Sequence, residues 1–471
     1  MTMPRPEHAA LSGDARAFRG LPVLIVGVGR SGCAAARWLL ARGARVTATD
    51  HKPLQELGRE VVALADAGVR LHAGRHDDTL FASASLIIVS PGVPLSLPPL
   101  VAARQRGVPV VSEVDLEAAT IGRRCIGITG SNGKSTTTAL VEAMLSAAGH
   151  EAIACGNFGV PLCDAVQGDH PDRWYSIELS SFQLESTFSL RASAAILLNI
   201  QSDHLDRHGS FEAYRAAKYR IDDLRAAGAP LVLCVDDPEV AALAATAREP
   251  VLRVSVQRRV TEGGMVQGNE LQLVMGNTIE RLANVQELPV PGRHNQLNIL
   301  AAAVACRAAG VSLDAVRRGL LKFRALPHRL QEVAQVRGVR FVDDSKATNV
   351  GSALQAIAAL AGAKLWVLLG GRDKASDFLP LVAALREVGA TAITFGEAGP
   401  HIAEVLSAAG FTDLLRSTSL EIALRSAFER AASGDVILLA PACASFDAYS
   451  GYAARGDHFA MLARSLAGTD T

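Results

Sequence analysis

The chain of 471 residues is long enough for about three domains, each with its own hydrophobic core. Its 47 lysines and arginines balance 47 aspartates and glutamates without a dense basic block, so a general nucleic-acid binder is excluded and no nucleic-acid partner is expected. A hydrophobic content of 49% with 20% charged residues excludes a largely disordered chain.

The first part of the chain alternates short apolar runs with helical segments, which is typical of a parallel α/β sheet. The predicted elements are a strand at 21–26, a helix from there to about residue 42, and strands at 45–49, 86–89 and 108–111. We therefore predict a Rossmann-like first domain over residues 1–112. Its N-terminal extension, residues 1–18, carries no pattern that indicates a role.

The second part, residues 113–325, repeats this pattern around a glycine-rich loop and predicts a domain like that of the P-loop ATPases. Its predicted elements are strands at 125–129, 175–179, 194–198 and 231–235, helices at 135–148 and 295–307, and a hairpin insert within 262–277.

The third part, residues 326–471, predicts a second Rossmann-like α/β domain. Its strands are expected at 340–342, 365–369, 391–395 and 436–439, each followed by a helical segment. Linkers are expected near 112–124 and 322–328. The fold class is thus α/β in three domains.

Seven cysteines lie scattered without a C-x2-C pair, which indicates free thiols in a reducing compartment and excludes zinc ribbons and disulfide frameworks. Residues 1–20 lack an apolar signal-peptide core, and no later run approaches the roughly 20 apolar residues of a membrane-spanning helix. We therefore expect a cytoplasmic protein without a membrane span.

A glycine turn, Gly27–Gly32, directly follows the first strand, and Asp50 ends the next one, which matches the dinucleotide-binding fingerprint. Alone, this pattern indicates NAD. The glycines let a helix N-terminus approach any diphosphate, however, so a nucleotide-sugar fits equally well. A turn needed only for packing is the remaining alternative.

The strongest local signal is the segment Gly127–Thr136 between a predicted strand and helix. Backbone N–H groups of such a loop cradle phosphates, and Lys134 can neutralise the charge of a transferring phosphoryl group. The segment departs from the strict G-x4-G-K-[ST] spacing, because Ile128 stands six positions before Lys134. ATP or GTP is the expected ligand.

Oxygen ligands for Mg²⁺ are expected beside those phosphates, with Ser135 as the first and Glu178 as the second. Glu178 ends a predicted strand, where ligands of α/β sheets collect, although a merely exposed or capping glutamate is the commoner case. His204 and His208, with neighbouring aspartates, allow a zinc cluster as an alternative, and helix capping by Asp203 is the simpler one.

Two further segments carry polar groups with weaker signals. Lys218 lies in a helical segment where composition alone predicts a solvated lysine. The segment Asp343–Asn349 gathers charge, hydroxyl and amide groups directly after a strand of the third domain, where a loop would present them to a ligand. A plain capped helix start explains this segment almost as well.

Together, these segments resemble the Mur ligases of peptidoglycan synthesis, over nearly the whole chain. The blocks that carry the resemblance, in chain order, are Thr129–Thr136, Glu178–Glu185, Asn199–Arg207, Tyr214–Ile221, Gly292–Asn298, Leu326–Arg329, Asp344–Asn349, Gly370–Lys374 and Pro441–Asp447.

The resemblance implies roles for individual residues. Lys134, Glu178, His204 and Lys218 are implied as the catalytic set, and two Mg²⁺ ions are implied on Ser135, Glu178, His204 and a carbamate formed on Lys218. The implied ATP site comprises Gly130, Ser131, Asn132, Gly133, Lys134, Ser135, Thr136, Asn157, Asn295, Asn298, His328, Arg329 and Asp344. Uridine diphosphate would bind Arg30, Ser31, Asp50 and Gly92, and glutamate would bind Lys346, Thr348, Lys374, Ser445, Phe446 and Tyr452.

The resemblance further implies an ATP-dependent amide-forming ligase with small-molecule substrates, acting as a monomer. The substrates would be UDP-N-acetylmuramoyl-L-alanine and D-glutamate, joined through an acyl phosphate, with domain closure about residues 323–328. The alternatives are a related ligase that takes L-glutamate or another amino acid, a folylpolyglutamate-synthase-like enzyme, an NAD-dependent oxidoreductase built on Gly27–Gly32, and a non-catalytic nucleotide-binding module.

Overall fold

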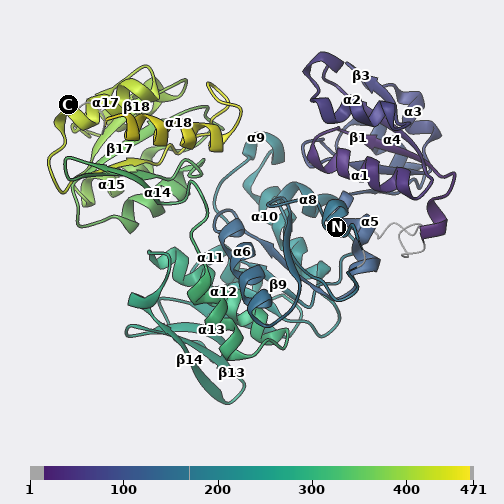
Figure 1. The fold of residues 1–471 in the computed structure, drawn as a ribbon, viewed down its shortest axis with the longest axis horizontal. Coiled ribbons are helices and arrows are strands. Elements are labelled where there is room, and N and C mark those ends of the chain that lie inside the picture. Colours follow the sequence, from purple (N-terminus) through teal and green to yellow (C-terminus); the bar gives the residue numbers. More distant parts are fainter. Residues whose placement is uncertain (1–14, 169, 467–471) are drawn as a thin grey trace. The chain divides into compact units, whose positions relative to one another are not determined.

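The computed structural model describes residues 15–168 and 170–466, so most of the N-terminal extension lies outside the described residues. The described chain forms three separate sheets, each wound with helices, as Figure 1 shows in purple, teal to green, and yellow-green. By its internal contacts the chain divides into two compact units: residues 1–200, 212–288 and 297–323 form the first, and residues 201–211, 289–296 and 324–471 form the second.

The first sheet has five parallel strands in the order β3-β2-β1-β4-β5. Its elements are β1 (Pro22–Val26), α1 (Arg30–Ala41), β2 (Arg45–Asp50), α2 (Arg59–Asp66), β3 (Arg70–Ala73), α3 (Asp78–Ser83), β4 (Leu86–Val89), α4 (Pro98–Gln105) and β5 (Val110–Val111). Strand β3 was missed because it is largely exposed and forms no apolar run. The direction of winding reverses between β1 and β4, so the loops after these two strands leave room for a ligand.

Alternate residues of β1 point to opposite faces and bury two separate cores. Val23 and Ile25 pack with residues of α1 and α2, whereas Leu24 and Val26 pack with residues of α3 and α4. Helices therefore cover both faces of this sheet, as the Rossmann-like prediction requires.

The central sheet has nine strands in the order β14-β13-β12-β11-β10-β9-β6-β8-β7. Its strands are β6 (Cys125–Thr129), β7 (Ala152–Gly156), β8 (Trp174–Glu178), β9 (Ala194–Leu197), β10 (Leu231–Cys234), β11 (Val251–Ser255), β12 (Gly263–Gln267), β13 (Glu270–Met275) and β14 (Thr278–Asn284). The predicted hairpin insert is confirmed as β12–β13 and extended by β14, all antiparallel at one edge.

Within residues 113–168 and 170–322 the structure has nine α-helices, of which α9 belongs to the second compact unit. They are α5 (Glu113–Ile121), α6 (Lys134–Ala147), α7 (Leu162–Ala165), α8 (Ser181–Ser186), α9 (Leu205–His208), α10 (Phe211–Tyr219), α11 (Pro238–Leu243), α12 (Arg293–Ala308) and α13 (Leu313–Lys322). Helices α6 and α13 touch at Gly319, where a Cβ would lie 2.6 Å from Met144 Cα. The glycine thus allows the two helices to approach closely.

The third sheet has six strands in the order β15-β16-β20-β17-β18-β19, of which only β15 is antiparallel. Its elements are β15 (Gln331–Val336), β16 (Val339–Asp343), α14 (Val350–Ala359), β17 (Leu365–Gly370), α15 (Leu379–Glu387), β18 (Thr391–Phe395), α16 (Gly399–Ala408), β19 (Leu414–Arg416), α17 (Leu420–Arg430), β20 (Val436–Leu439) and α18 (Tyr452–Ser465). Helices α14, α15 and α16 cover one face, and α17 and α18 cover the other.

The two expected linkers have different outcomes. The segment 112–124 is no extended linker, because residues 113–121 form the helix α5 and most of its side chains, including three acidic ones, are buried. The sequence does not indicate this burial, because the segment is short and acidic and contains no apolar run. The segment 322–328 does lie between α13 and β15, and the second unit resumes at Arg324.

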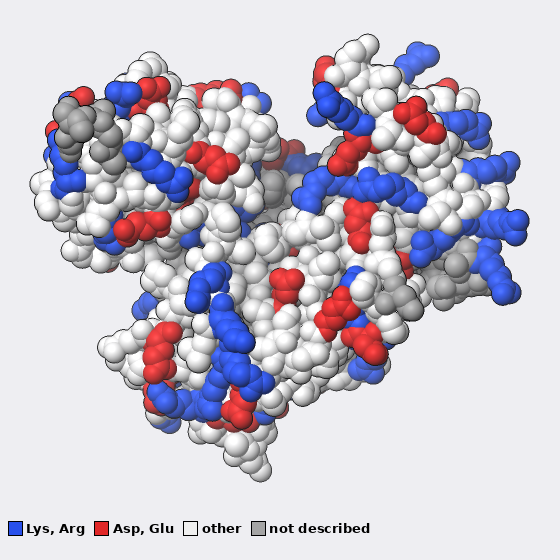
Figure 2. Space-filling view, viewed as in Figure 1, with Lys and Arg blue, Asp and Glu red and all other residues white. Residues whose placement is uncertain are grey.

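Surface and burial agree with the composition in two respects. All seven cysteines are free and buried. On the face shown in Figure 2, basic and acidic side chains are interspersed between wide uncharged areas. Within residues 15–168 and 170–466, no helix is long and apolar enough to cross a bilayer.

Candidate functional site

The glycine-rich loop between β6 and α6 is shaped by two glycines that other residues could not replace. Gly130 and Gly133 have φ values of 157° and 82°, and a Cβ on Gly133 would collide with the Asn298 side chain. Gly133 is the N-cap of α6, so the first N–H groups of that helix face the loop and favour an anion there.

Two lysines converge on this loop. The Nζ of Lys134 donates to the carbonyl oxygens of Gly130, at 2.9 Å, and Ser131, at 2.8 Å. The Nζ of Lys218 donates to the same Gly130 oxygen at 2.7 Å. Two ammonium groups on one carbonyl oxygen make the loop strongly electropositive, which suits a polyphosphate.

Lys218 is not the solvated lysine that composition alone predicted, because it is only 1% exposed. Its ammonium lies 4.8 Å from the ring centroid of Tyr214, whose hydroxyl bonds Ser131 Oγ at 2.7 Å. The helical segment expected around Lys218 is confirmed as α10, but composition could not show that Lys218 lies on the face of α10 that contacts the loop.

Asn199, which follows β9, forms hydrogen bonds with the backbone of the loop. Its Oδ1 accepts the Asn132 N–H at 2.8 Å, its Nδ2 donates to Asn132 O at 3.1 Å, and its carbonyl accepts the Ser131 N–H at 2.9 Å. Asn199 lies in one of the blocks that carry the family resemblance, and these three bonds give it a positioning role.

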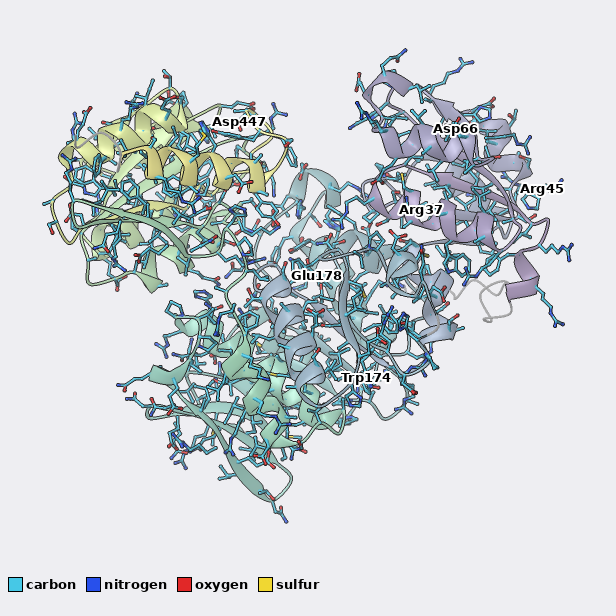
Figure 3. The ribbon with its side chains drawn as sticks, in the orientation of Figure 1. Arg37, Arg45, Asp66, Trp174, Glu178 and Asp447 are labelled. Atoms are coloured by element: carbon cyan, nitrogen blue, oxygen red, sulfur yellow. The ribbon has the colours of Figure 1, made fainter. Side chains whose placement is uncertain are left out.

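Glu178, labelled in Figure 3, ends β8, and its register partner on the adjacent strand is Ile128 of β6. The carboxylate therefore lies at the same sheet edge as the loop. Asn157 Nδ2 donates to Glu178 Oε1 at 2.6 Å, while Oε2 is buried with no hydrogen-bond partner among the described residues. A buried carboxylate oxygen left open beside a phosphate loop fits a hard cation such as Mg²⁺.

His204 occupies a strained backbone position, with φ 55° and ψ 33°, at the start of the short helix α9. It belongs to the second compact unit, whereas Ser135, Glu178 and Lys218 belong to the first. The N-cap residue of α9 is His204, and the Asp203 carboxylate accepts the His204 N–H at 3.0 Å and a bond from Asn349 Nδ2 at 3.0 Å. Across the described ranges, no group of three His, Cys, Asp or Glu side chains is arranged to hold a metal, so the zinc alternative gains no support.

The residues implied for ATP beyond the loop are divided between the two units. Asn157 and Asn298 lie in the first unit, and Asn295, His328, Arg329 and Asp344 lie in the second. His328, at φ 60°, bonds Asp343 through Nδ1 at 2.7 Å. Burial raises the pKa of Asp344 to about 7, against the opposing charge of Arg329.

The residues implied for glutamate follow three neighbouring parallel strands, β16, β20 and β17, at the same edge of the third sheet. The Lys346 ammonium lies 4.0 Å from the Tyr452 ring centroid, and Lys374 pairs with Asp203 at 3.5 Å. Ser445 is buried, whereas Phe446 is 63% exposed.

The first sheet carries a pocket of about 680 Å³ at its switch point, lined by all four residues implied for uridine diphosphate, Arg30, Ser31, Asp50 and Gly92. His51, Lys52 and His76 also line it, and so do Asn157 and Gln183 of the central region. No local sequence pattern indicates a role for these residues, because only the fold brings them together.

Comparisons with known proteins agree with this architecture. The Mur ligase MurD-like N-terminal domain matches residues 22–112, the Mur ligase middle domain matches residues 128–306, and the Mur ligase glutamate ligase domain matches residues 328–443. The UDP-N-acetylmuramoylalanine--D-glutamate ligase of Acidobacterium capsulatum is 42% identical over 447 residues, which cover 94% of this chain and 96% of that protein. The enzyme of the same name from Geobacillus kaustophilus is 39% identical, with 96% of this chain and 99% of that protein covered.

Solved structures share the fold at low sequence identity. The MurF ligase of Thermotoga maritima, in complex with ADP, gives a TM-score of 0.60 at 16% identity and covers 99% of this chain and 100% of its own. The UDP-N-acetylmuramate-alanine ligase of the same organism gives 0.58 at 19% identity and covers 94% of this chain and 99% of its own. With its three matched domains and its full-length relatives, this chain belongs to the Mur ligase family.

Proposed function

We propose that this protein is the ATP-dependent ligase that joins D-glutamate to UDP-N-acetylmuramoyl-L-alanine in peptidoglycan precursor synthesis. The observation that carries the proposal is the identity of 38–42% over nearly the full length to enzymes named UDP-N-acetylmuramoylalanine--D-glutamate ligase. Mur ligases use ATP, and the electropositive Gly130–Lys134 loop is the place in this chain that suits its phosphates. The alternative of an NAD-dependent oxidoreductase does not explain this loop, because such an enzyme does not need it.

The reaction follows from the chemistry of a carboxylate, which is a poor acyl donor. The γ-phosphoryl group of ATP passes to an oxygen of the alanyl carboxylate, which yields ADP and an acyl phosphate. The glutamate amine then attacks the acyl carbon, loses a proton, and phosphate leaves as the amide forms. No nucleophile from the protein is needed, so the side chains align substrates and stabilise charge.

Each proposed residue has a task in this scheme. Lys134 stabilises the charge spread over the moving phosphoryl group, and the N–H groups at the start of α6 hold the phosphates. Ser135, Glu178, His204 and a carbamate on Lys218 would hold two Mg²⁺ ions. When bound, such ions supply electrostatic stabilisation of the phosphates. The open, buried Oε2 of Glu178 is the feature of this chain that fits them best.

A carbamate on Lys218 has a physical rationale in this chain. Lys134 and Lys218 both donate to Gly130 O, so two like charges share one small region. Addition of CO₂ to the neutral amine forms an N–C bond, releases a proton, and converts the cation into an anion that can hold a metal ion. A mass increase of Lys218 that is lost on acidification would support this modification, and an unmodified lysine in active enzyme would oppose it.

The remaining residues divide into substrate-binding groups. The pocket of the first sheet, with Arg30, Ser31, Asp50 and Gly92, would take the uridine diphosphate. Asn157, Asn295, Asn298, His328, Arg329 and Asp344 would hold the adenosine end of ATP. The loops with Lys346, Thr348, Lys374, Ser445, Phe446 and Tyr452 would take glutamate. The proposal also includes a monomeric state and a cytoplasmic location. Its three domains would span residues 1–112, 113–325 and 326–471.

The decisive experiment measures phosphate release by the purified protein with ATP, Mg²⁺ and UDP-N-acetylmuramoyl-L-alanine. D-glutamate, L-glutamate and no amino acid form the three arms. Release only with D-glutamate supports the proposal. Release with L-glutamate instead would keep the mechanism and identify the enzyme as the related ligase that takes L-glutamate. No release in any arm would contradict a ligase of this substrate class.

A further inference from the structure

Arg455, in the first turn of α18, is a fully buried cation whose exposed fraction is 0%. All of its hydrogen bonds go to neutral acceptors. Nε donates to Ser345 Oγ at 3.0 Å, Nη2 donates to Ser345 O at 2.9 Å and Cys443 O at 3.1 Å, and Nη1 donates to Gly370 O at 3.3 Å and Ala444 O at 3.2 Å. Every N–H donor of a guanidinium is thereby used.

A buried arginine without a carboxylate partner requires an explanation, because burial of an unpaired charge destabilises a protein. Among residues 15–168 and 170–466, no acidic side chain forms an ion pair with Arg455. Burial lowers the pKa of Arg455 to about 10, which still leaves the side chain charged at neutral pH. Five carbonyl and hydroxyl oxygens replace its hydration shell.

The acceptors lie at the bases of three loops. Ser345 directly precedes Lys346, Gly370 ends β17 four residues before Lys374, and Ala444 directly precedes Ser445. Ser345 Oγ also accepts from Arg455 while it donates to Tyr452 O at 2.8 Å, so the start of α18 is tied to the same loop. One guanidinium therefore connects every loop that carries the glutamate residues proposed above.

The next residue of α18 contacts a different group. A Cβ on Gly456 would collide with His328 Nδ1 and would lie 2.6 Å from Asp343 Oδ2. Gly456 thus leaves the space in which the His328–Asp343 hydrogen bond forms. His328 belongs to the residues proposed for the adenosine end of ATP, not to those proposed for glutamate.

We propose that the first turn of α18 is a positioning element that sets two substrate sites through two adjacent residues. Arg455 fixes the glutamate loops, and Gly456 fixes His328 for the nucleotide. Neither residue touches a substrate, so both act through the groups that they hold. The inference rests on the proposed function for the identity of the substrates.

The kinetic test uses the full-length enzyme and compares Arg455→Met with Gly456→Ala. Arg455→Met should raise the KM for D-glutamate by about tenfold or more and leave the KM for ATP within about twofold, because Arg455 bonds none of the residues proposed for the nucleotide. Gly456→Ala should raise the KM for ATP by about tenfold and leave that for D-glutamate within about threefold. Alanine is the better helix former, so a loss in this variant is not a loss of helix propensity.

Arg464→Met is the matched control on the same helix, since Arg464 Nε donates to Val333 O at 3.3 Å on the exposed side. It should leave both KM values unchanged. Arg455→Lys keeps the charge but loses the planar guanidinium with its five N–H donors. Its KM for D-glutamate should therefore lie between those of the wild type and Arg455→Met. If both KM values rise together in both variants, α18 has a general structural role and the proposal is wrong.

Hydrogen exchange in the absence of substrates separates this inference from the proposed function. In Arg455→Met, or in Arg455→Lys if the former does not fold, the amides of 344–348, 371–374 and 443–447 should exchange faster than in the wild type, while the strands β16, β17 and β20 keep their protection. Equal loss of protection throughout the domain would overturn the positioning role. A wild type that releases no phosphate would contradict only the substrate assignment, because the exchange result stands without it.

Discussion

Two glycine turns in the first compact unit share one local pattern and differ in the side chains around them. Both follow a parallel strand and open a helix: Gly27–Gly32 leads from β1 into α1, and Gly130–Gly133 leads from β6 into α6. In each, a cation stands at the first helical position, Arg30 in the former and Lys134 in the latter.

The polar groups around the two turns differ. At the first turn, Asp50 accepts the N–H groups of Val28 at 2.9 Å and Lys52 at 3.0 Å, and Ser90 Oγ donates to Gly27 O at 2.6 Å. These polar groups stabilise the turn itself. At the second, two ammonium groups converge on Gly130 O, and the buried Glu178 Oε2 remains open. The glycine pattern alone does not distinguish the two.

Replacement of Lys134 by alanine should have the largest effect. We expect kcat for phosphate release to fall by about 10³-fold or more, because a charge aimed at the transferring phosphoryl group is lost. Steady-state phosphate release with all three substrates measures it. Lys364→Ala is the control, since Lys364 is an exposed lysine that donates to Gly389 O at 2.7 Å. A kcat within tenfold of the wild type would show that the second turn only binds.

Glu178→Gln should come next, with a fall in kcat of about 10²-fold and a higher Mg²⁺ concentration for half-maximal rate. The amide keeps the shape and an oxygen for the bond from Asn157, so the loss reports the charge. A Mg²⁺ titration of the rate measures the shift. The exposed Glu151, which pairs with Arg173, provides the control variant Glu151→Gln. An unchanged Mg²⁺ dependence would remove Glu178 from the metal site.

Alanine at the two helix N-caps should separate the turns by backbone conformation. Gly133 has φ 82° and lies against Asn298, whereas Gly29 has φ −71° and has no atom within 4 Å of its Cβ position. We expect Gly133→Ala to cost about 1–2 kcal/mol in backbone strain alone, with loss of activity, while Gly29→Ala stays close to the wild type in stability. Thermal unfolding of both variants tests this, and equal effects would contradict it.

Arg30→Ala should raise the KM for UDP-N-acetylmuramoyl-L-alanine by about tenfold with kcat within about twofold, since it removes a charge that only binds. The Arg30 guanidinium donates to Gly159 O and lies on the pocket wall. The same kinetic assay, with ATP and D-glutamate saturating, measures both constants. A fall in kcat as large as that of Lys134→Ala would erase the distinction between the turns.

The sequence predicted the α/β class, most strands and both glycine turns, because apolar runs and glycines are local signals. The first and last residues of strands β6, β18 and β20 coincide with the predicted ones. Burial was harder to predict: Lys218 and Arg455 look like solvated lysine and arginine residues until the fold brings acceptor carbonyls to them. The linker predicted near 112–124 is wrong for the same reason, because the carboxylates of α5 are buried by residues distant in sequence.

Helix α5 lies between α1 of the first sheet and α7 of the central region, and a substitution in it should have the smallest effect on catalysis. Glu113 Oε1 accepts the Cys163 N–H at 2.5 Å. Glu117 Oε1 accepts hydrogen bonds from Trp38 Nε1, in α1, and from Arg42 Nη2, at the end of α1. Burial raises the pKa of Glu113 from 4.5 to about 7. The folded protein therefore binds more protons than the unfolded chain between pH 4.5 and 7, and its stability must fall as the pH rises through this range.

Glu113→Gln should remove that part of the pH dependence. The variant should be more stable than the wild type at pH 8 by about 1–3 kcal/mol, and close to it or less stable at pH 4.5, because only the ionised carboxylate is penalised by burial. Thermal unfolding at the two pH values measures this difference, with the exposed Glu151→Gln as control. Both KM values and kcat should stay within about twofold. A variant that shows the wild-type pH dependence would place the titrating carboxyl elsewhere, with Asp115 on the same helix, whose pKa burial raises to about 6, as the next to replace.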